Sequence, residues 1–444
     1  MRTATWNANP VDNDWSNPAN WTPATVPNGP NDVATFGVST TTDVSITAPI
    51  EVNSIVFSPE ASAFTVTLPT SGTIGLTISG TGITNDSGVT QNVVSYGHEI
   101  SFHNNASADD ATIVSNGANI IFFDDSTAAN ATIIANGSDQ FGIIAVDPAN
   151  AGNATLIANG GGTNGGFIDM NGNGSSTARI ELYDTGTLYI GYGGGNSVIV
   201  GSIEGDGQII IGEAEYLIVG TNHLSTVFSG VIRDDSPPIM ESSWDAPDKV
   251  VGGSLFKIGS GTLSLTGANP YSGTTTVIEG ALNVANRNGS ATGKSLVNVD
   301  SGAVGGTGTI AEELNVGNGS GAGAVLRPSL GGIKPSSLSI HRALNLKADS
   351  TYTYKLNTDR AEADKVIANG ITIDSGAQFN FVALANKTLR PGKVFVAISN
   401  TAATPISGTF ANLPDGSTFT VGSNTFQVSY SGGDGNDLTL TVVP

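Results

Sequence analysis

The chain of 444 residues contains no cysteine, so neither a disulfide framework nor a thiolate metal site can form. Charged residues make up 12% of the sequence, about half of the usual ~25%. Lys and Arg together number only 17 against 38 Asp and Glu, which gives a net charge of −21. This charge repels phosphate backbones and anionic lipids, so we expect neither nucleic acid nor a membrane surface as a partner.

Long hydrophobic runs and helical patterns are also missing. Apolar blocks such as Ile120 to Phe123 are far shorter than the ~18 residues of a transmembrane helix, so we expect no membrane insertion of this chain. Apolar residues at helical spacing are interrupted by Gly, Asn or Pro throughout. Gly is abundant, with 58 residues, and Val, Ile and Thr are plentiful. This composition predicts a folded, all-β protein rather than a disordered one.

One phrase recurs three times: ATIVSNG at 111–117, ATIIANG at 131–137 and ATLIANG at 154–160. The starts are 20 and then 23 residues apart, and each copy is a short apolar strand that ends in an Asn-Gly turn. A strand that recurs at near-constant spacing predicts a solenoid of stacked coils. We expect each glycine of these turns to take a positive φ, and the stacked asparagines to form hydrogen-bonded ladders.

Changes in composition divide the chain into five predicted segments. These are a Trp/Pro/Asn-rich N-terminal cap (1–45), a β-helix with tandem coils of 20–23 residues (46–232), a Pro-rich loop or linker (233–250), further β-helix (251–345) and a C-terminal β region (346–444). In the cap, Trp6, Trp15 and Trp21 either cover the first coil, which we favour, or present an aromatic platform to carbohydrate. The last segment either continues the helix or closes it with a small antiparallel sheet.

Residues 255–286 carry a more specific pattern, with a lysine, spaced glycines and Thr-Leu-x-Leu over Lys257 to Leu265, followed by GAN at 267–269, YSG at 271–273 and GAL at 280–282. This pattern resembles the autotransporter-associated β-strand repeat, also called the passenger-associated transport repeat. The opening ANW…VPNGPNDVATF and the closing YSGGDGNDLTLTVV are similar to autotransporter-type passenger proteins as well. In AVLRPSLGGIKPSSLSI, Ser329 stands where the family usually has Gly, and we expect an altered corner there.

The resemblance implies a single-stranded, right-handed parallel β-helix that is secreted or held on the outer surface of a bacterium. It further implies a structural or adhesive role without a reaction, so we expect no enzyme activity and no cofactor. Partners would be cell-surface or matrix glycans, or copies of the same chain. Two alternatives remain open: a self-assembling extracellular fibre subunit, and a carbohydrate-active β-helix enzyme such as a polysaccharide lyase or hydrolase.

Calcium is the metal for which the sequence offers ligands. GGDGNDLTL at 432–440 nearly matches the calcium-binding nonapeptide GGxGxDxUx, which makes Asp434 and Asp437 the candidate ligands. Thr439 stands where a large apolar residue belongs, and a single copy supplies only half of such a site.

The remaining motifs argue against catalysis and phosphate binding rather than for them. The doublets Asp109-Asp110, Asp124-Asp125 and Asp234-Asp235 do not converge by themselves, because adjacent residues of a strand point to opposite faces. Residues 104–178 contain no Lys or Arg, which disfavours a lyase for acidic sugars. GSATGKS at 289–295 resembles a P-loop with one residue missing, and we expect no phosphate cradle from it.

Overall fold

The computed structural model describes residues 2–146, 151–161, 164–170, 176–191, 197–234, 252–321, 323–330 and 332–444. Within these residues the regular elements are β-strands apart from one 3-10 turn, η1 (Pro18–Asn20), so the all-β prediction is confirmed. The chain forms two compact units, the first ending at Leu217 and the second beginning at Ile218. Residues 235–250, most of the predicted linker, lie outside the described residues.

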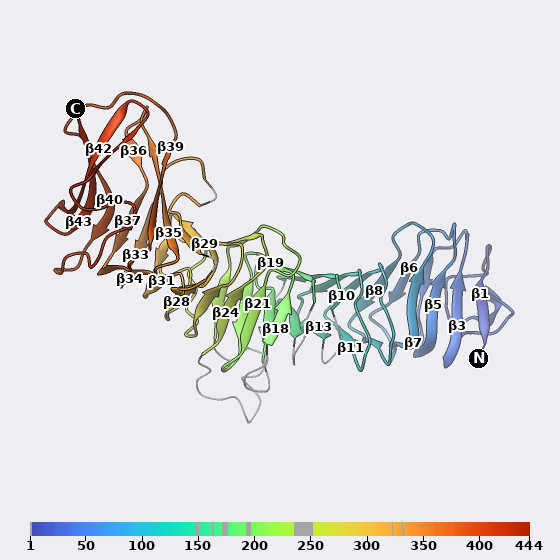
Figure 1. Cartoon of the computed structure of the whole chain (residues 1–444). Helices are drawn as coiled ribbons and strands as arrows, with labels where there is room; N and C mark the ends of the chain where they lie inside the picture. The colour runs from blue at the N-terminus through green and yellow to red at the C-terminus, as the bar shows by residue number, and fades with distance from the viewer. Residues whose placement is uncertain are drawn as a thin grey trace. The chain divides into compact units, whose positions relative to one another are not determined.

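Strands of the first unit stack in two rows, and from β3 to β17 successive strands along the chain alternate between them (Figure 1). The first row follows the order β2 (Trp21–Thr22), β1 (Thr3–Trp6), β3 (Gly29–Phe36), β5 (Ile50–Phe57), β7 (Leu76–Asn85), β9 (Ile100–Phe102), β11 (Asn119–Phe122), β13 (Gly142–Val146), β15 (Gly166–Met170), β17 (Thr187–Ile190) and β20 (Gln208–Ile211). The second row comprises β4 (Asp43–Ser45), β6 (Thr65–Leu68), β8 (Asn92–Tyr96), β10 (Thr112–Asn116), β12 (Thr132–Asn136), β14 (Thr155–Asn159), β16 (Arg179–Tyr183) and β19 (Ser202–Gly205). β18 (Ser197–Val200) also belongs to this unit, and β21 (Tyr216–Val219) contains the division between the units.

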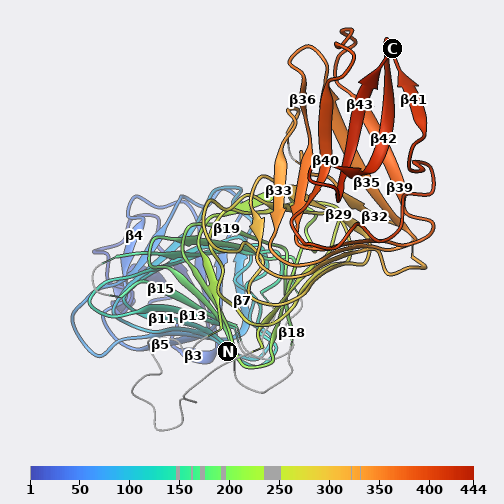
Figure 2. The same cartoon turned by 90° about the vertical axis from the view of Figure 1, so that its left-hand side faces the viewer.

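The repeated phrase forms three consecutive strands of the second row. Thr112 pairs with Thr132 and Thr132 with Thr155 in parallel register, so equivalent residues of each copy lie above one another. Figure 2 looks along the stack, so that the coils of the first unit overlap one behind another. Because side chains alternate along a strand, Ile113, Ile133 and Leu156 all point inward and are fully buried. The predicted solenoid of stacked coils is therefore confirmed.

The Asn-Gly turns differ from the expectation in one respect. Only Gly117 has the expected positive φ, of 72°, whereas Gly137 and Gly160 do not. At these two positions glycine is required by the neighbouring coil: a Cβ on Gly137 would lie 2.0 Å from the carbonyl oxygen of Asn164, and one on Gly160 would lie 2.6 Å from Cβ of Asp184. The expectation was wrong there because close packing between coils, not the local turn, selects glycine.

An aromatic cluster fills the N-terminal end of the first unit. Trp6, Trp15 and Trp21 are at most 1% exposed and pack around Phe36, with ring centroids 5.1–6.1 Å apart. The indole nitrogen of Trp21 donates to the Trp15 carbonyl at 2.7 Å, and that of Trp15 donates to the Pro27 carbonyl at 3.1 Å. The rings therefore cover the first coil and leave no ring face for a sugar.

Strands of the second unit also stack in rows, at first two and then three. Its first row follows the order β22 (Thr226–Phe228), β25 (Thr262–Leu265), β27 (Ala281–Val284), β29 (Gly302–Gly306), β32 (Ala324–Leu326), β35 (Ser350–Asn357) and β39 (Gln378–Ala383). The second comprises β24 (Ser254–Lys257), β26 (Thr275–Val277), β28 (Val297–Val299), β31 (Leu314–Val316), β34 (Leu344–Leu346) and β38 (Ile371–Ile373). The third follows the order β30 (Thr309–Ile310), β33 (Ser337–Ile340), β37 (Lys365–Ala368), β40 (Val394–Asn400), β43 (Asp437–Val443), β42 (Asn424–Gly432) and β41 (Thr418–Val421). The remaining strands are β23 (Val231–Arg233) and β36 (Glu362–Ala363).

The C-terminal segment combines the two arrangements considered for it. β37 and β40 are parallel, so the coils continue into this segment. β43 then pairs antiparallel with β40, and β42 and β41 follow antiparallel. Antiparallel pairing with β43 occupies the edge of β40 on which the strand of a further coil would have paired.

The corner at Ser329 is built around a buried carboxylate. Ser329 is 1% exposed, and its hydroxyl donates to Asp364 Oδ2 at 3.0 Å. Asp364 also accepts the backbone N–H groups of Ser336 at 2.8 Å and Lys355 at 3.0 Å. Burial raises the pKa of Asp364, and these donors oppose that rise. A glycine could not supply the hydroxyl, which accounts for serine at this position.

Candidate functional site

A polar groove crosses the outer face of four strands in the first unit. β5, β7, β9 and β11 are parallel neighbours, and the register aligns Glu51 with Thr77 and Thr77 with Ser101. Glu51 alternates with the buried Ile50 and Val52, so it points away from the core. The groove has a volume of about 460 Å³ and is lined by Pro30, Asn31, Glu51, Asn53, Thr77, Ser79, His103, Asn104 and Asp124.

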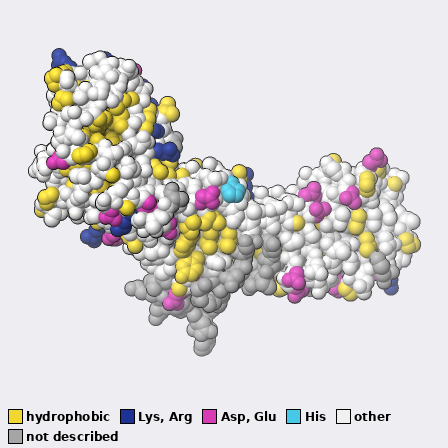
Figure 3. All heavy atoms as spheres, in the orientation of Figure 1, with side chains coloured by type: hydrophobic (Ala, Val, Ile, Leu, Met, Phe, Trp, Pro, Cys, Tyr) yellow, Lys and Arg dark blue, Asp and Glu magenta, His cyan; other side chains and the backbone are white. Residues whose placement is uncertain are grey.

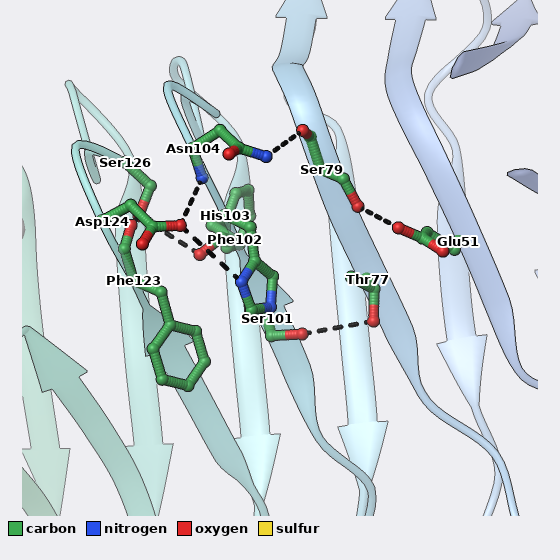
Figure 4. A network of polar contacts seen from close by, with 10 residues as sticks. All are labelled: Glu51, Thr77, Ser79, Ser101, Phe102, His103, Asn104, Phe123, Asp124 and Ser126. Carbon is green, nitrogen blue, oxygen red and sulfur yellow. Dashed lines mark hydrogen bonds and ion pairs between the residues drawn. The ribbon is translucent and has the colours of Figure 1, made fainter. Parts of the chain in front are cut away.

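Hydrogen bonds hold the groove side chains in place (Figure 4). Ser79 donates from Oγ to Glu51 Oε1 at 2.5 Å, and Asn104 donates from Nδ2 to the Ser79 carbonyl at 2.7 Å. The backbone N–H of Asn104, a residue with φ of 57°, donates to Asp124 Oδ2 at 2.9 Å. Each bond joins neighbouring coils, so the groove is rigid before any ligand arrives.

His103 supplies an aromatic surface at the edge of this groove. Its ring stacks on Phe123 with centroids 4.6 Å apart and an angle of 16° between the planes. Nδ1 of His103 lies 4.0 Å from Asp124 Oδ2, at a position where both side chains are partly exposed. An aromatic face beside hydroxyl and amide groups suits the hydrogen-bonding and C–H surfaces of a sugar.

The two carboxylates of the groove are far apart. Three strand spacings of ~4.8 Å separate β5, which carries Glu51, from β11, which precedes Asp124, a distance of about 14 Å. Glycosidases place their two carboxyl groups about 5–9.5 Å apart. The geometry of this groove therefore supports binding better than hydrolysis.

Carboxylates of the predicted acid doublets accept hydrogen bonds from other segments of the chain. Asp109 Oδ2 accepts the backbone N–H of Asn85 at 2.7 Å, and Asp110 Oδ1 accepts Nδ2 of the same asparagine at 2.9 Å. Asp234 Oδ2 accepts the backbone N–H groups of Ser272 at 2.7 Å and Gly252 at 3.1 Å. Asp109, Asp110 and Asp234 fasten one segment to another, whereas Asp124 of the third doublet lies in the groove.

A cluster that the sequence analysis missed lies on the outer face of β16 and β19. Glu181 and Glu204 are aligned partners on these adjacent strands, and Nε of Arg179 contacts both, at 3.0 Å from Glu181 Oε1 and in a shorter contact with Glu204 Oε1. Tyr183 donates its hydroxyl to Glu181 Oε2 at 2.8 Å, and this bond raises the pKa of Tyr183 to about 12. The signal was available, because the 23 residues between the two glutamates equal the repeat length.

The motif residues at 255–284 contribute to the wall of the second unit. Lys257 is 2% exposed, and its Nζ donates to the carbonyls of Ile258, Gly259 and Glu279 at 2.5, 2.7 and 3.3 Å. Burial lowers the pKa of Lys257 to about 8, and the charge of Glu279 opposes this change. Tyr271 is fully buried, with its hydroxyl 2.5 Å from Thr275 Oγ1, and burial raises its pKa.

The candidate calcium ligands lie at the turn between β42 and β43. Asp434 is exposed in the turn, whereas Asp437 is 7% exposed and accepts the backbone N–H of Asn400 through Oδ1 at 2.9 Å. Over the described ranges, no group of three or more His, Asp or Glu side chains is arranged to hold a metal ion. Calcium binding by Asp434 and Asp437 stays a prediction.

Comparison with known proteins adds one match. Residues 255–284 match the family model of the passenger-associated transport repeat. No curated protein matches the chain. In the part of the chain that the structure describes, no helix is long and apolar enough to cross a membrane. The chain therefore carries a passenger-associated transport repeat within a parallel β-solenoid, a combination that fits an autotransporter passenger.

Proposed function

We propose that this protein is a non-enzymatic passenger, secreted or displayed on the outer surface of a bacterium, with a structural or adhesive role. The observation that carries the proposal is the transport repeat at 255–284, whose strands stack in register with the coils around them. Lys257 and Tyr271 of this repeat are buried and hydrogen-bonded, which supports a role in building the wall rather than in chemistry.

The polar groove of the first unit is the surface that we assign to adhesion. Its neutral amides and hydroxyls and the stacked ring of His103 suit a cell-surface or matrix glycan. On the face of the molecule drawn in Figure 3, charged side chains occupy a small part of the surface.

The test has two parts. An antibody against the first unit should label intact cells of the source bacterium, and external protease should remove the label; an antigen found only after lysis contradicts the proposal. On a panel of neutral glycans, His103→Ala should weaken binding about tenfold, whereas Tyr96→Ala, at an exposed aromatic residue outside the groove lining, should leave it unchanged. Equal losses in both variants would remove the groove from the proposal.

Assembly with further copies into a fibre has less support. The tryptophan cluster covers the N-terminal coil, and antiparallel strands follow the last parallel pair at the C-terminal end. Head-to-tail stacking needs an open coil edge at each end. Negative-stain images of purified protein should show single particles; long filaments would favour the fibre.

The Arg179 cluster is the observation that favours a carbohydrate-active enzyme as a second candidate. Glu181 and Glu204 lie on strands ~4.8 Å apart, close to the ~5 Å separation of carboxyl groups in retaining glycosidases. Arg179 between them neutralises charge, which favours a structural ion pair. A polysaccharide depolymerisation screen decides: fragments that disappear in Glu181→Gln would establish the enzyme, and no fragments from the wild type would support the passenger.

A further inference from the structure

A second groove lies entirely within the second unit, on the outer surface of successive coils. Its volume is about 480 Å³, and it follows the turns after β25, β27 and β33. The apolar part of the lining includes Val231, Ala268 and Pro270, and the basic part consists of Arg287, Lys294 and His341. Among the lining residues that the structure describes, none other than His341 is aromatic.

The charge of this groove is opposite to that of the chain. The sequence holds 17 Lys and Arg and 4 His against 38 acidic residues, yet the described residues of the lining include three basic side chains and no Asp or Glu. Glu312, next to the lining residue Ala311, is 3.8 Å from Nε of Arg342 and so has a basic neighbour of its own. Within the described residues, the side chains of Arg287, Lys294 and His341 form no ion pair with an acidic group.

The backbone beneath these basic residues is fixed. Asn286 donates from Nδ2 to the carbonyls of Asn288 and Gly289, both at 3.0 Å, and its Oδ1 accepts the backbone N–H of Thr309 at 2.8 Å. The loop that presents Arg287 is therefore tied to the next coil. The backbone N–H of Lys294 donates to the Tyr271 carbonyl at 2.9 Å, which ties it to the preceding coil. Because this backbone is already ordered, a ligand that binds here would cost the loop little conformational entropy.

The P-loop-like segment at 289–295 contributes its lysine to this groove, but not a ring of free amides. The backbone N–H of Ala291 donates to the Thr309 carbonyl at 3.1 Å, and that of Thr292 donates to Ser290 Oγ at 3.2 Å. With the Lys294 N–H also engaged, these amides are not directed at a phosphate. An anion in the groove would be bound by side chains.

We propose that this groove binds a segment of acidic polysaccharide. Arg287 and His341 belong to coils two layers apart, since Asn286 bonds to Thr309 and Thr309 pairs with Ser339. Two layers span about 10 Å, comparable with two sugar residues of an extended chain. Carboxylate or sulfate groups repeated along the chain meet the basic side chains of Arg287, Lys294 and His341, and the C–H faces of the rings lie on the apolar floor. The choice of a polysaccharide over other polyanions rests on the proposed surface location.

Binding of purified full-length chain to polygalacturonate, dextran sulfate and neutral dextran tests this assignment. We expect at least one acidic polymer to bind, neutral dextran not to bind, and affinity to fall as salt rises. The double variant Arg287→Gln/Lys294→Gln should weaken binding about tenfold. The matched control Arg360→Gln/Lys387→Gln removes the same charge from exposed positions of the same unit, outside the groove lining, and should bind as the wild type does.

Several outcomes separate the possibilities. Preference for polygalacturonate or for dextran sulfate identifies the anionic group, and either preference supports the proposal. Equal losses in the groove and control variants, or equally tight binding of double-stranded DNA through the same residues, would overturn it. Surface labelling of cells without polysaccharide binding refutes this inference alone, whereas binding by a protein that never reaches the surface refutes the proposed function alone.

Discussion

Asn136 donates a hydrogen bond from Nδ2 to Oδ1 of Asn116 at 2.9 Å. It accepts a second bond at its own Oδ1 from Nδ2 of Asn159 at 2.8 Å. The three asparagines end equivalent strands of consecutive coils, so the parallel register alone brings them into a ladder. A similar ladder joins Asn298, Asn315 and Asn345 in the second unit, at 3.0 and 2.9 Å. The predicted asparagine ladders are thereby confirmed.

Asn136→Ala should lower the free energy of unfolding of the first unit by about 1–2 kcal/mol, because the central position of the ladder takes part in two bonds. Hydrogen exchange should accelerate first in β10, β12 and β14. Asn130→Ala is the control, since this asparagine accepts a single exposed bond from Asn153 at 3.2 Å. Equal effects of the two substitutions would show that the ladder does not contribute to the free energy of unfolding.

Gly137→Ala should destabilise the first unit by about 1–3 kcal/mol through overpacking against the Asn164 carbonyl, although the φ of Gly137 is not left-handed. Gly97→Ala is a contrasting variant: Gly97 has φ of 84° and open space around its Cβ position, so only ~1 kcal/mol of backbone strain is expected. Denaturant unfolding measures both. A Gly97 variant that costs more than the Gly137 variant would reverse our account of these turns.

Trp15→Ala should remove about 3–5 kcal/mol from the stability of the N-terminal coils, because the ring is fully buried and packs between Trp21 and Phe36. Exchange of amides in β1, β3 and β5 should rise, and size-exclusion chromatography should reveal association through the uncovered coil. Val11→Ala, at a side chain 73% exposed in the same segment, serves as the control. Retained protection of β1 and β3 in Trp15→Ala would argue against the capping role.

Stability of the second unit should depend on pH through Lys257. The folded-state pKa is about 8 against the ordinary 10.5, so between these values the unfolded chain binds more protons and stability rises with pH. Above about pH 10 the effect is opposed, because burial raises the pKa of Tyr271 and Tyr354 above the ordinary 10.0 and the unfolded chain loses those protons first. The measurement therefore belongs between pH 7 and pH 10.

The difference in stability between wild type and Lys257→Met isolates this residue. It should shift in favour of the wild type by at most about 1.4 kcal/mol per pH unit above pH 8. Lys387→Met, at an exposed lysine, controls for the loss of one positive charge. A difference that stays constant from pH 7 to pH 10 would mean that the three carbonyls around Nζ hold Lys257 protonated throughout.

The sequence by itself determined the coil, its register and the identity of the interior. The ATIVSNG phrases place Thr112 over Thr132 and Ile113 over Ile133, because a two-residue alternation repeated at coil length leaves one pairing that buries every aliphatic side chain. The transport repeat could also be recognised from the sequence, because its residues lie close together along the chain and each contributes to the wall of its own coil.

Tertiary structure alone decided which side chains from different coils meet. Arg287 and Lys294, from the turn after β27, gather in one groove with His341, from the turn after β33. Turn lengths vary from coil to coil, so local patterns do not fix where exposed residues lie relative to one another. Gly137 shows the same limit, since what excludes a Cβ there is the backbone of another coil rather than its own φ.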